Sequence, residues 1–360
     1  MNENTMPKCN NGKYKYVFVC GLHRSGTSVL GRNIARLENC TGFKNTGVLM
    51  DEGQRLQDVY PLAVEYGGAG RFGFDPRTHR TETSDLLTPK NIARLRASWH
   101  KHWNSNKTIC VEKTPGNLLM TRFLQAAFPN SYFVVIRRHP VPVSMANQKW
   151  KINITSLYSL FEHWLRCHEV FEEDRKYLRH VYELKYEDYI ENPGKYHGEI
   201  AAFLGTRIPE PPKEDKFRIV TDWYNPTGLR VPESAMEKTS RAHNQKYFER
   251  WHNLLENSSF KGYYRYVARK YEQQFAKYGY SLTRGFGIDE ELLRSRANTS
   301  VILAAAYCAG ADTGAFFRRF ATWARWYVKK YVKRLLPESM LRTMRQACEP
   351  FNKRKADARL

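Results

Sequence analysis

Short apolar runs alternate with longer segments of helical spacing along the first 205 residues. The apolar runs cover residues 14–20, 108–112, 131–138 and 181–186. Their length and β-branched content predict buried strands. Apolar residues three or four positions apart predict helices over residues 27–37, 117–128, 140–150, 156–177 and 193–205. This alternation is typical of an α/β protein, with a central parallel sheet flanked by helices.

Two regions depart from the alternation. Residues 42–90 are rich in Gly, Asp, Arg and Pro, as in YGGAGRFGFDPRTHRTETSD, and predict a long irregular insertion. Such a segment in a compact domain is usually functional or disordered. Residues 229–280 are polar and are predicted to be mostly helical. We expect one domain over residues 1–300, with a core at 14–280 and the insertion at about 42–105.

The segment VFVCGLHRSGTSVLGRNI joins the first strand to a helix through a loop bounded by Gly21 and Gly26. Backbone N–H groups and the positive end of the helix dipole converge in such a loop and favour an anion. Side-chain donors accompany them at Arg24, Ser25, Thr27 and Ser28. The spacing matches the start of a Walker A loop, but Thr27 stands where a nucleoside triphosphatase has Lys. The predicted fold is therefore P-loop-like with three layers, and its donor need not be a triphosphate.

GLHRSGTS resembles the 5′-phosphosulfate loop of sulfotransferases that use 3′-phosphoadenosine 5′-phosphosulfate (PAPS). The likeness is to the branch with an Arg-Ser-Gly-Thr core, which includes bacterial carbohydrate sulfotransferases and protein-tyrosine sulfotransferases. Four later segments resemble the family in order: VEKTPGN at 111–117, FVVIRRHP at 133–140, LKYEDYIENP at 184–193 and HNQKYFERWHN at 243–253. The resemblance covers about residues 14–280 and makes residues 1–300 a sulfotransferase domain. It implies sulfonyl transfer from PAPS to an acceptor hydroxyl, with a carbohydrate or glycolipid as the expected acceptor, 3′,5′-ADP as product and no metal.

The resemblance also implies the catalytic residues. The family places its base about two dozen residues after the loop, which implies Glu52, with Asp51 and His23 as alternatives. Lys113 matches a lysine that contacts the transferring group and the leaving oxygen, and Arg24 adds charge from the loop. A solvated acid at a helix start and a surface lysine at a strand end are the structural alternatives for Glu52 and Lys113. Glu112 is expected to hold Lys113 or a helix end, and Asn117 to begin the next helix.

Donor binding is implied for residues in the loop and in three later segments. The loop contributes His23, Arg24, Ser25, Gly26, Thr27 and Ser28. Arg138 matches the arginine that binds the 3′-phosphate, and Tyr186 matches a tyrosine near the adenine or that phosphate. The family's serine eight positions after the arginine is Ala146 here, so Ser144 or Asn147 would replace it. Lys246 and Arg241 would close over the 3′-phosphate. A core tyrosine and a solvated basic helix are the alternatives for Tyr186 and Lys246.

The formal net charge of +22 predicts an anionic partner: nucleic acid, an anionic membrane surface, or a phosphorylated or sulfated small molecule. Residues 315–360 carry 13 Lys and Arg against 3 Asp and Glu. Apolar residues recur there at helical spacing: Phe316, Phe320, Trp323, Tyr327, Tyr331 and Leu335. Residues 301–360 are thus predicted to be a basic amphipathic helical tail. It would either contact an anionic membrane at its periphery or pack on the protein's own core.

The seven cysteines are scattered and form no CxxC pair, which argues against a zinc site or a disulfide framework and favours a reducing compartment. No signal-peptide pattern and no run of about 20 apolar residues is visible. We therefore expect a cytoplasmic location, on the cytoplasmic face of a membrane if the tail binds lipid.

Two other functions compete with sulfonyl transfer. A P-loop kinase or NTPase should end a strand in an acid, whereas residues 131–138 end in Arg137 and Arg138. A non-enzymatic nucleic-acid or membrane binder would explain the charge, but no nucleic-acid-binding motif is recognisable, so no nucleic-acid partner is predicted.

Overall fold

The computed structural model describes residues 13–148, 156–209, 233–258 and 260–284, and five isolated positions between 306 and 317. The side chains of residues 233–243 lie outside the description. Apart from those five positions, so does the predicted tail at 301–360, whose helix therefore stays a prediction.

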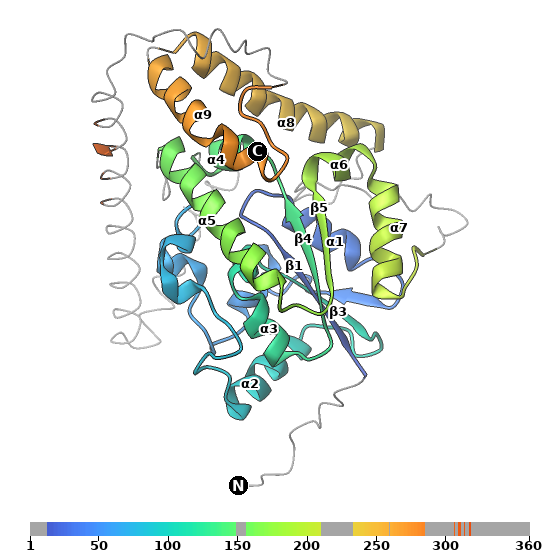
Figure 1. The fold of residues 1–360 in the computed structure, drawn as a ribbon. Coiled ribbons are helices and arrows are strands. Elements are labelled where there is room, and N and C mark those ends of the chain that lie inside the picture. Colours follow the sequence, from blue (N-terminus) through green and yellow to red (C-terminus); the bar gives the residue numbers. More distant parts are fainter. Residues whose placement is uncertain are drawn as a thin grey trace, which may run out of the picture.

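A five-stranded sheet lies at the centre of the molecule (Figure 1). Its strands are β1 (Lys15–Cys20), β2 (Cys40–Gly42), β3 (Ile109–Lys113), β4 (Ser131–Arg137) and β5 (Val181–Lys185). The spatial order is β2-β3-β1-β4-β5, and every neighbouring pair is parallel. The predicted α/β class with a central parallel sheet is confirmed. The four predicted strands match β1, β3, β4 and β5, while the three-residue β2 is too short to show in the hydrophobic pattern.

Helices cover both faces of the sheet and form two hydrophobic cores. One core lies beneath α1 (Thr27–Ile34), α6 (Tyr186–Glu191) and α7 (Pro193–Leu204). The other core lies beneath α2 (Pro89–His100), α3 (Thr121–Ala127), α4 (Pro140–Gln148) and α5 (Leu157–Arg175). Helices α8 (Glu233–Glu256) and α9 (Lys261–Ala276) extend this core by packing on α4 and α5. Apolar side chains on both faces explain why the strands read as continuous apolar runs rather than as alternating ones.

The helix predicted over residues 117–128 is wrong as a single element. A 3₁₀ helix, Pro115–Leu119, comes first, and α3 begins after Met120, whose φ of −141° is not helical. Pro115 starts the tight turn, and the buried carboxylate of Glu112 accepts a hydrogen bond from the Asn117 amide within it. A side-chain contact across five residues therefore overrides the local helical pattern.

The region predicted to be irregular contains five short 3₁₀ helices between Leu49 and Thr78, followed by α2. Buried Tyr60, Phe72 and Trp99 pack it into the larger core. Four cysteines in the described ranges, Cys20, Cys40, Cys110 and Cys167, are buried and unpaired. Within those ranges, no helix is long and apolar enough to cross a bilayer.

Candidate active site

The carboxyl ends of the strands bring the sequence motifs together. β1 leads into the 21–28 loop, β3 ends at Lys113, and β4 ends next to Arg138. The register pairs Val19 with Lys113 and Cys20 with Val135, so these ends lie at one edge of the sheet. β3 lies on one side of β1 and β4 on the other, so the chain changes direction around the central strand. Parallel sheets bind ligands at such a switch point.

The loop after β1 has the geometry of an anion cradle. Gly26 has a left-handed φ of 95°, and a Cβ at this position would lie 2.6 Å from Cδ2 of Tyr186. Only glycine combines this backbone with so close an approach. Ser25 is buried, and its Oγ has no hydrogen-bond partner among the described residues. Thr27 begins α1, which has no side-chain cap, so the backbone N–H groups at the start of this helix and the Ser25 hydroxyl are available to an anion.

Glu52 and Lys113 form a buried ion pair beside this loop. Nζ of Lys113 lies 3.3 Å from Oε1 of Glu52 and 3.2 Å from the Met50 carbonyl oxygen, to which it donates. Gln54 donates its Nε2 to the other carboxylate oxygen of Glu52 at 2.6 Å. Both side chains of the pair are about one-tenth exposed, which excludes a solvated surface acid and a surface lysine. Gln54 was missed from the sequence, because nothing in its spacing marks it.

His23 lies near this pair, since the charges of Glu52 and Lys113 both act on its ring. Burial lowers the pKa of His23 to about 4, and the opposing effect of Glu52 does not offset it. The imidazole is therefore neutral at pH 7. Its Nδ1 is buried without a hydrogen-bond partner in the described ranges. A neutral ring can hold a polar group, but it is a weak base.

The carboxylate of Asp51 is hydrogen-bonded within its own turn. Its carboxylate accepts hydrogen bonds from N and Oγ1 of Thr46, at 2.8 and 2.5 Å, and from N of Asn45 at 3.3 Å. Burial acts to raise the pKa of Asp51, but these hydrogen bonds outweigh it and hold the pKa below its ordinary value. Asp51 thus closes its own turn.

Glu112 fixes the turn that carries Glu52. Its carboxylate accepts from N of Gly53 at 2.9 Å, from the Thr114 hydroxyl and from the Asn117 amide. The Asn117 contact agrees with the expected helix-end role, while the Gly53 contact was not foreseen. A Cβ on Gly53 would lie 2.6 Å from Cγ of Glu112, so the turn needs glycine there. Glu112 therefore connects β3 to the residue that follows Glu52.

Arg138 is buried at the end of β4 and reaches the loop. Its Nη1 donates to the Arg24 carbonyl at 2.7 Å, while Nε and Nη2 donate to Oδ1 of Asn244 at 3.2 and 2.8 Å. Its guanidinium carbon lies 4.3 Å from the ring centroid of Tyr186, the first residue of α6. Arg138 thus joins the loop, α6 and α8. Asn244 lies in the 243–253 segment noted above, but its amide gives no signal in the sequence.

The remaining predicted donor residues divide into buried and exposed ones. Ser144 and Asn147 on α4 are buried. Neither the Ser144 Oγ nor the Asn147 Oδ1 has a hydrogen-bond partner in the described part of the chain. Lys246 is exposed on α8, where Asn244 is the side chain that contacts Arg138. The side chain of Arg241 lies outside the description.

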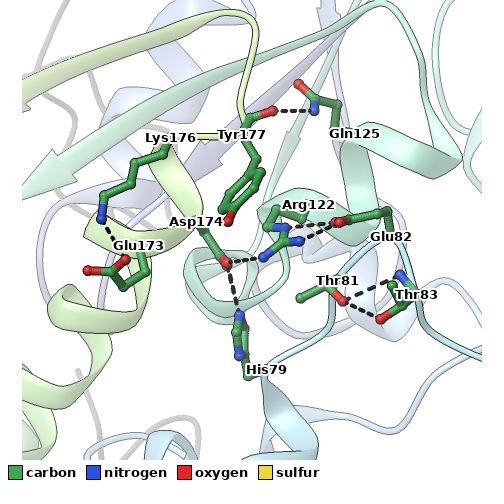
Figure 2. Close-up of polar contacts among 10 residues, drawn as sticks. All are labelled: His79, Thr81, Glu82, Thr83, Arg122, Gln125, Glu173, Asp174, Lys176 and Tyr177. Carbon is green, nitrogen blue, oxygen red and sulfur yellow. Dashed lines mark hydrogen bonds and ion pairs between the residues drawn. The ribbon is translucent and has the colours of Figure 1, made fainter.

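A polar cluster fastens the end of the insertion to the helices beneath it (Figure 2). Nε2 of His79 lies 3.0 Å from both carboxylate oxygens of Asp174, which is buried near the end of α5. Arg122 on α3 lies 3.5 Å from the same carboxylate, pairs with Glu82 and stacks on Tyr177 with its guanidinium carbon 4.0 Å from the ring centroid. This cluster fixes the segment that carries Arg77 and Arg80.

The chain is similar to a known protein family over the residues that carry most of these features. The model of the sulfotransferase family matches residues 17–210, more than half of the 360-residue chain. No curated protein sequence matches. Among the described residues, no group of three His, Cys, Asp or Glu side chains is placed to hold a metal ion.

Solved structures with similar folds include three sulfotransferases. The sulfotransferase domain of the curacin biosynthetic pathway is 13% identical, with 71% of this chain and 97% of that chain covered and a TM-score of 0.40. The sulfotransferase domain of the Synechococcus PCC 7002 olefin synthase is 16% identical, with 66% and 90% covered and a TM-score of 0.40. A sulfotransferase from Mycobacterium tuberculosis H37Rv is 16% identical, with 56% and 70% covered and a TM-score of 0.38. On the match to the family model, this chain belongs to the sulfotransferase family and is a sulfotransferase enzyme.

Proposed function

We propose that this sulfotransferase takes its sulfonyl group from PAPS and transfers it to a hydroxyl of a carbohydrate or glycolipid acceptor. The proposal depends above all on the meeting, at one edge of the sheet, of the 21–28 loop, the Glu52–Lys113 pair and Arg138. PAPS supplies an activated sulfonyl group with 3′,5′-ADP as its leaving group. The rest of the chemistry belongs to the residues of the chain.

The loop is proposed to hold the 5′ end of the donor. Its backbone N–H groups, the N-terminus of α1 and the hydroxyls of Thr27 and Ser28 are suited to an anion. The buried, unpartnered Oγ of Ser25 supports this assignment, because a buried hydroxyl without a partner costs free energy unless a ligand satisfies it. His23, neutral at pH 7, and Arg24 complete the cradle.

Arg138 is proposed to bind the 3′-phosphate. A guanidinium has five N–H donors, and the contacts to Asn244 and Arg24 use three of them. Tyr186 supports the guanidinium from one side. Ser144, whose buried Oγ lacks a partner in the described ranges, is proposed as the replacement for the family's serine. Lys246 remains a proposed contributor that would have to turn inward from an exposed position.

Glu52 is proposed as the base that removes the proton from the acceptor hydroxyl. Asp51 is engaged by Thr46 and Asn45, whereas Glu52 contacts Lys113, so Glu52 is proposed ahead of Asp51 and of His23, which is assigned to the loop. Lys113 and Arg24 are proposed to offset the negative charge that develops on the transferring group. Gln54 and Glu112 keep the Glu52 turn in place.

Donor identity can be tested by thermal shift with 3′,5′-ADP, ADP and ATP in the absence of metal. Selective stabilisation by 3′,5′-ADP is expected. Arg138→Ala should remove that preference, while Arg137→Ala is the control, because Arg137 pairs with Glu172 and Glu183 instead. Equal responses to the three nucleotides, or a response that needs ATP and Mg²⁺, would restore the P-loop kinase alternative.

The role of Glu52 can be tested by sulfonyl-transfer rates. Glu52→Gln should retain 3′,5′-ADP binding and lose about 10²–10⁴ in rate, as expected for removal of a general base. Asp51→Asn is the neighbouring control and should keep transfer. A Glu52→Gln enzyme with the wild-type rate would reject Glu52 as the base.

A cytoplasmic location and a peripheral membrane contact through residues 301–360 stay part of the proposal. The net charge of residues 315–360 supports that contact. A chain lacking residues 311–360 should no longer sediment with anionic liposomes. Undiminished sedimentation would assign the tail to another role.

A further inference from the structure

Arg55 ends the short turn that begins at the candidate base. The 3₁₀ helix Gly53–Arg55 starts after Glu52, and the backbone N of Arg55 donates to the Glu52 carbonyl oxygen at 2.9 Å. A turn closed by such a hydrogen bond brings residues three positions apart close together. Arg55 and the residue proposed as the base therefore belong to one turn, which the Glu112 carboxylate fixes through N of Gly53.

The guanidinium of Arg55 has a buried N–H without a protein acceptor. Its Nε is shielded from solvent and has no hydrogen-bond partner among the described residues. Glu52, the carboxylate of the same turn, pairs with Lys113 instead, and Lys113 also donates to the Met50 carbonyl oxygen. A buried N–H of a charged group costs free energy unless an acceptor satisfies it. The unused Nε of Arg55 therefore favours an anionic ligand.

Arg55 lies close enough to the loop after β1 for its charge to act on the ring of His23. Burial is the main cause of the low pKa of His23, about 4, and three cations lower this pKa further: Lys113, Arg24 and Arg55. The charge of Glu52 acts in the opposite direction. Three cations and one carboxylate thus influence the loop histidine, and the positive excess favours an anion beside it.

The loop offers unused polar atoms of its own. Nδ1 of His23 and Oγ of Ser25 are buried and have no hydrogen-bond partner in the described part of the chain. A hydroxyl donates a hydrogen bond, and Nδ1 of a neutral imidazole does so when it carries the proton. Unused donors therefore come from the loop and from the Glu52 turn. A ligand group with several oxygens can receive donors from both.

We propose that Arg55 is a further catalytic residue, which donates to the sulfonyl oxygens of the donor. The proposal rests on the proposed function, because it takes PAPS as that donor. In the transfer, the acceptor hydroxyl gives its proton to Glu52 and its oxygen forms a bond to sulfur. The bond from sulfur to the 5′-phosphate oxygen breaks, and its electron pair stays on that oxygen. The sulfonyl oxygens carry negative charge throughout, and the Arg55 guanidinium offsets it.

Affinities for two nucleotides that differ in the sulfonyl group test the proposal. PAPS carries this group and 3′,5′-ADP lacks it, while the 5′ end of each has about two negative charges at neutral pH. Isothermal titration calorimetry of the full chain measures both affinities. Arg55→Gln should bind PAPS about tenfold more weakly and 3′,5′-ADP within about twofold of the wild type, as expected for loss of one hydrogen bond to a charged group. Arg55→Lys should lose less affinity for PAPS, because it keeps the charge.

Arg94→Gln is the control, because Arg94 on α2 pairs with Asp58, and neither affinity should change. An unchanged affinity of Arg55→Gln for PAPS would overturn the proposal. An equal loss for both nucleotides would overturn it as well, since Arg55 would then support the nucleotide site as a whole. If thermal unfolding shows that Arg55→Gln does not fold, the same two outcomes in Arg55→Lys decide.

The wild-type titrations separate this proposal from the one on which it rests. If the wild type binds neither nucleotide, the donor proposal fails and the role of Arg55 fails with it. If the wild type binds 3′,5′-ADP and PAPS, and Arg55→Gln does not distinguish them from each other, only the role of Arg55 is rejected.

Discussion

Replacing Glu112 with Gln tests how a buried carboxyl holds the candidate base in place. Burial raises the pKa of Glu112 from 4.5 to about 7, although Thr114, Gly53, Asn117 and the charge of Lys113 all act to lower it. The Glu112→Gln side chain keeps the shape and can still accept from Gly53. Oδ1 of Asn117 has no hydrogen-bond partner among the described residues, so its amide can turn and accept from the new amide. The variant should therefore keep its contacts to Gly53, Thr114 and Asn117 without an ionisable group.

The size and sign of the effect follow from the two pKa values. A raised pKa means that the folded protein binds the proton more tightly than the unfolded chain does. The stability that Glu112 contributes is thus fully present below pH 4.5 and is lost as the pH rises towards 7. The interval between those values corresponds to about 3 kcal/mol. Relative to the wild type, Glu112→Gln should gain about 2–3 kcal/mol in free energy of unfolding between about pH 5 and pH 8.

Urea unfolding at several pH values in that interval measures the gain directly. Glu173→Gln serves as the control, because Glu173 is 73% exposed and the difference from the wild type should stay flat. A flat difference for Glu112→Gln as well would refute the reasoning, since it would mean that Glu112 does not change its protonation on folding. A stability gain of Glu112→Gln over the wild type that decreased as the pH rose would contradict the predicted sign.

Two further substitutions test the loop and the polar cluster. Gly26→Ala should cost about 1–2 kcal/mol for its left-handed backbone, and more because its Cβ would lie 2.6 Å from Tyr186. Gly47→Ala shares the left-handed backbone, at φ 81°, but has no atom within 4 Å of the new Cβ, so thermal unfolding should show a smaller loss. A loss as large as that of Gly26→Ala would exclude the close contact as its cause. Asp174→Asn should lower the free energy of urea unfolding by about 1–3 kcal/mol, because it weakens buried contacts to His79 and Arg122. Glu82 is half-exposed, so Glu82→Gln should lower the free energy of unfolding by less than about 1 kcal/mol. A larger loss for Glu82→Gln than for Asp174→Asn would contradict the assignment of the buried Asp174 carboxylate as the anchor of the cluster.

Local patterns in the sequence were sufficient to predict four strands of the sheet and the loop that follows β1. The apolar runs predicted four of the five strands, because a strand buried on both faces must be apolar throughout. The segment from Gly21 to Ser28 predicted the loop between β1 and α1, since strand, glycines, hydroxyls and helix are adjacent in the chain. The break at Met120 was not predicted, because the Glu112–Asn117 contact that accompanies it is a side-chain interaction.

Tertiary structure alone decided which polar side chains share the site. Gln54 meets Glu52, Asn244 meets Arg138, and the charge of Arg55 acts on His23. Local periodicity records only whether a residue faces the core, so it carries no information about contacts such as that between Arg138 and Asn244, which are 106 residues apart. Those pairings follow from strand order and from the way the insertion folds back on α3 and α5, and both are properties of the folded chain.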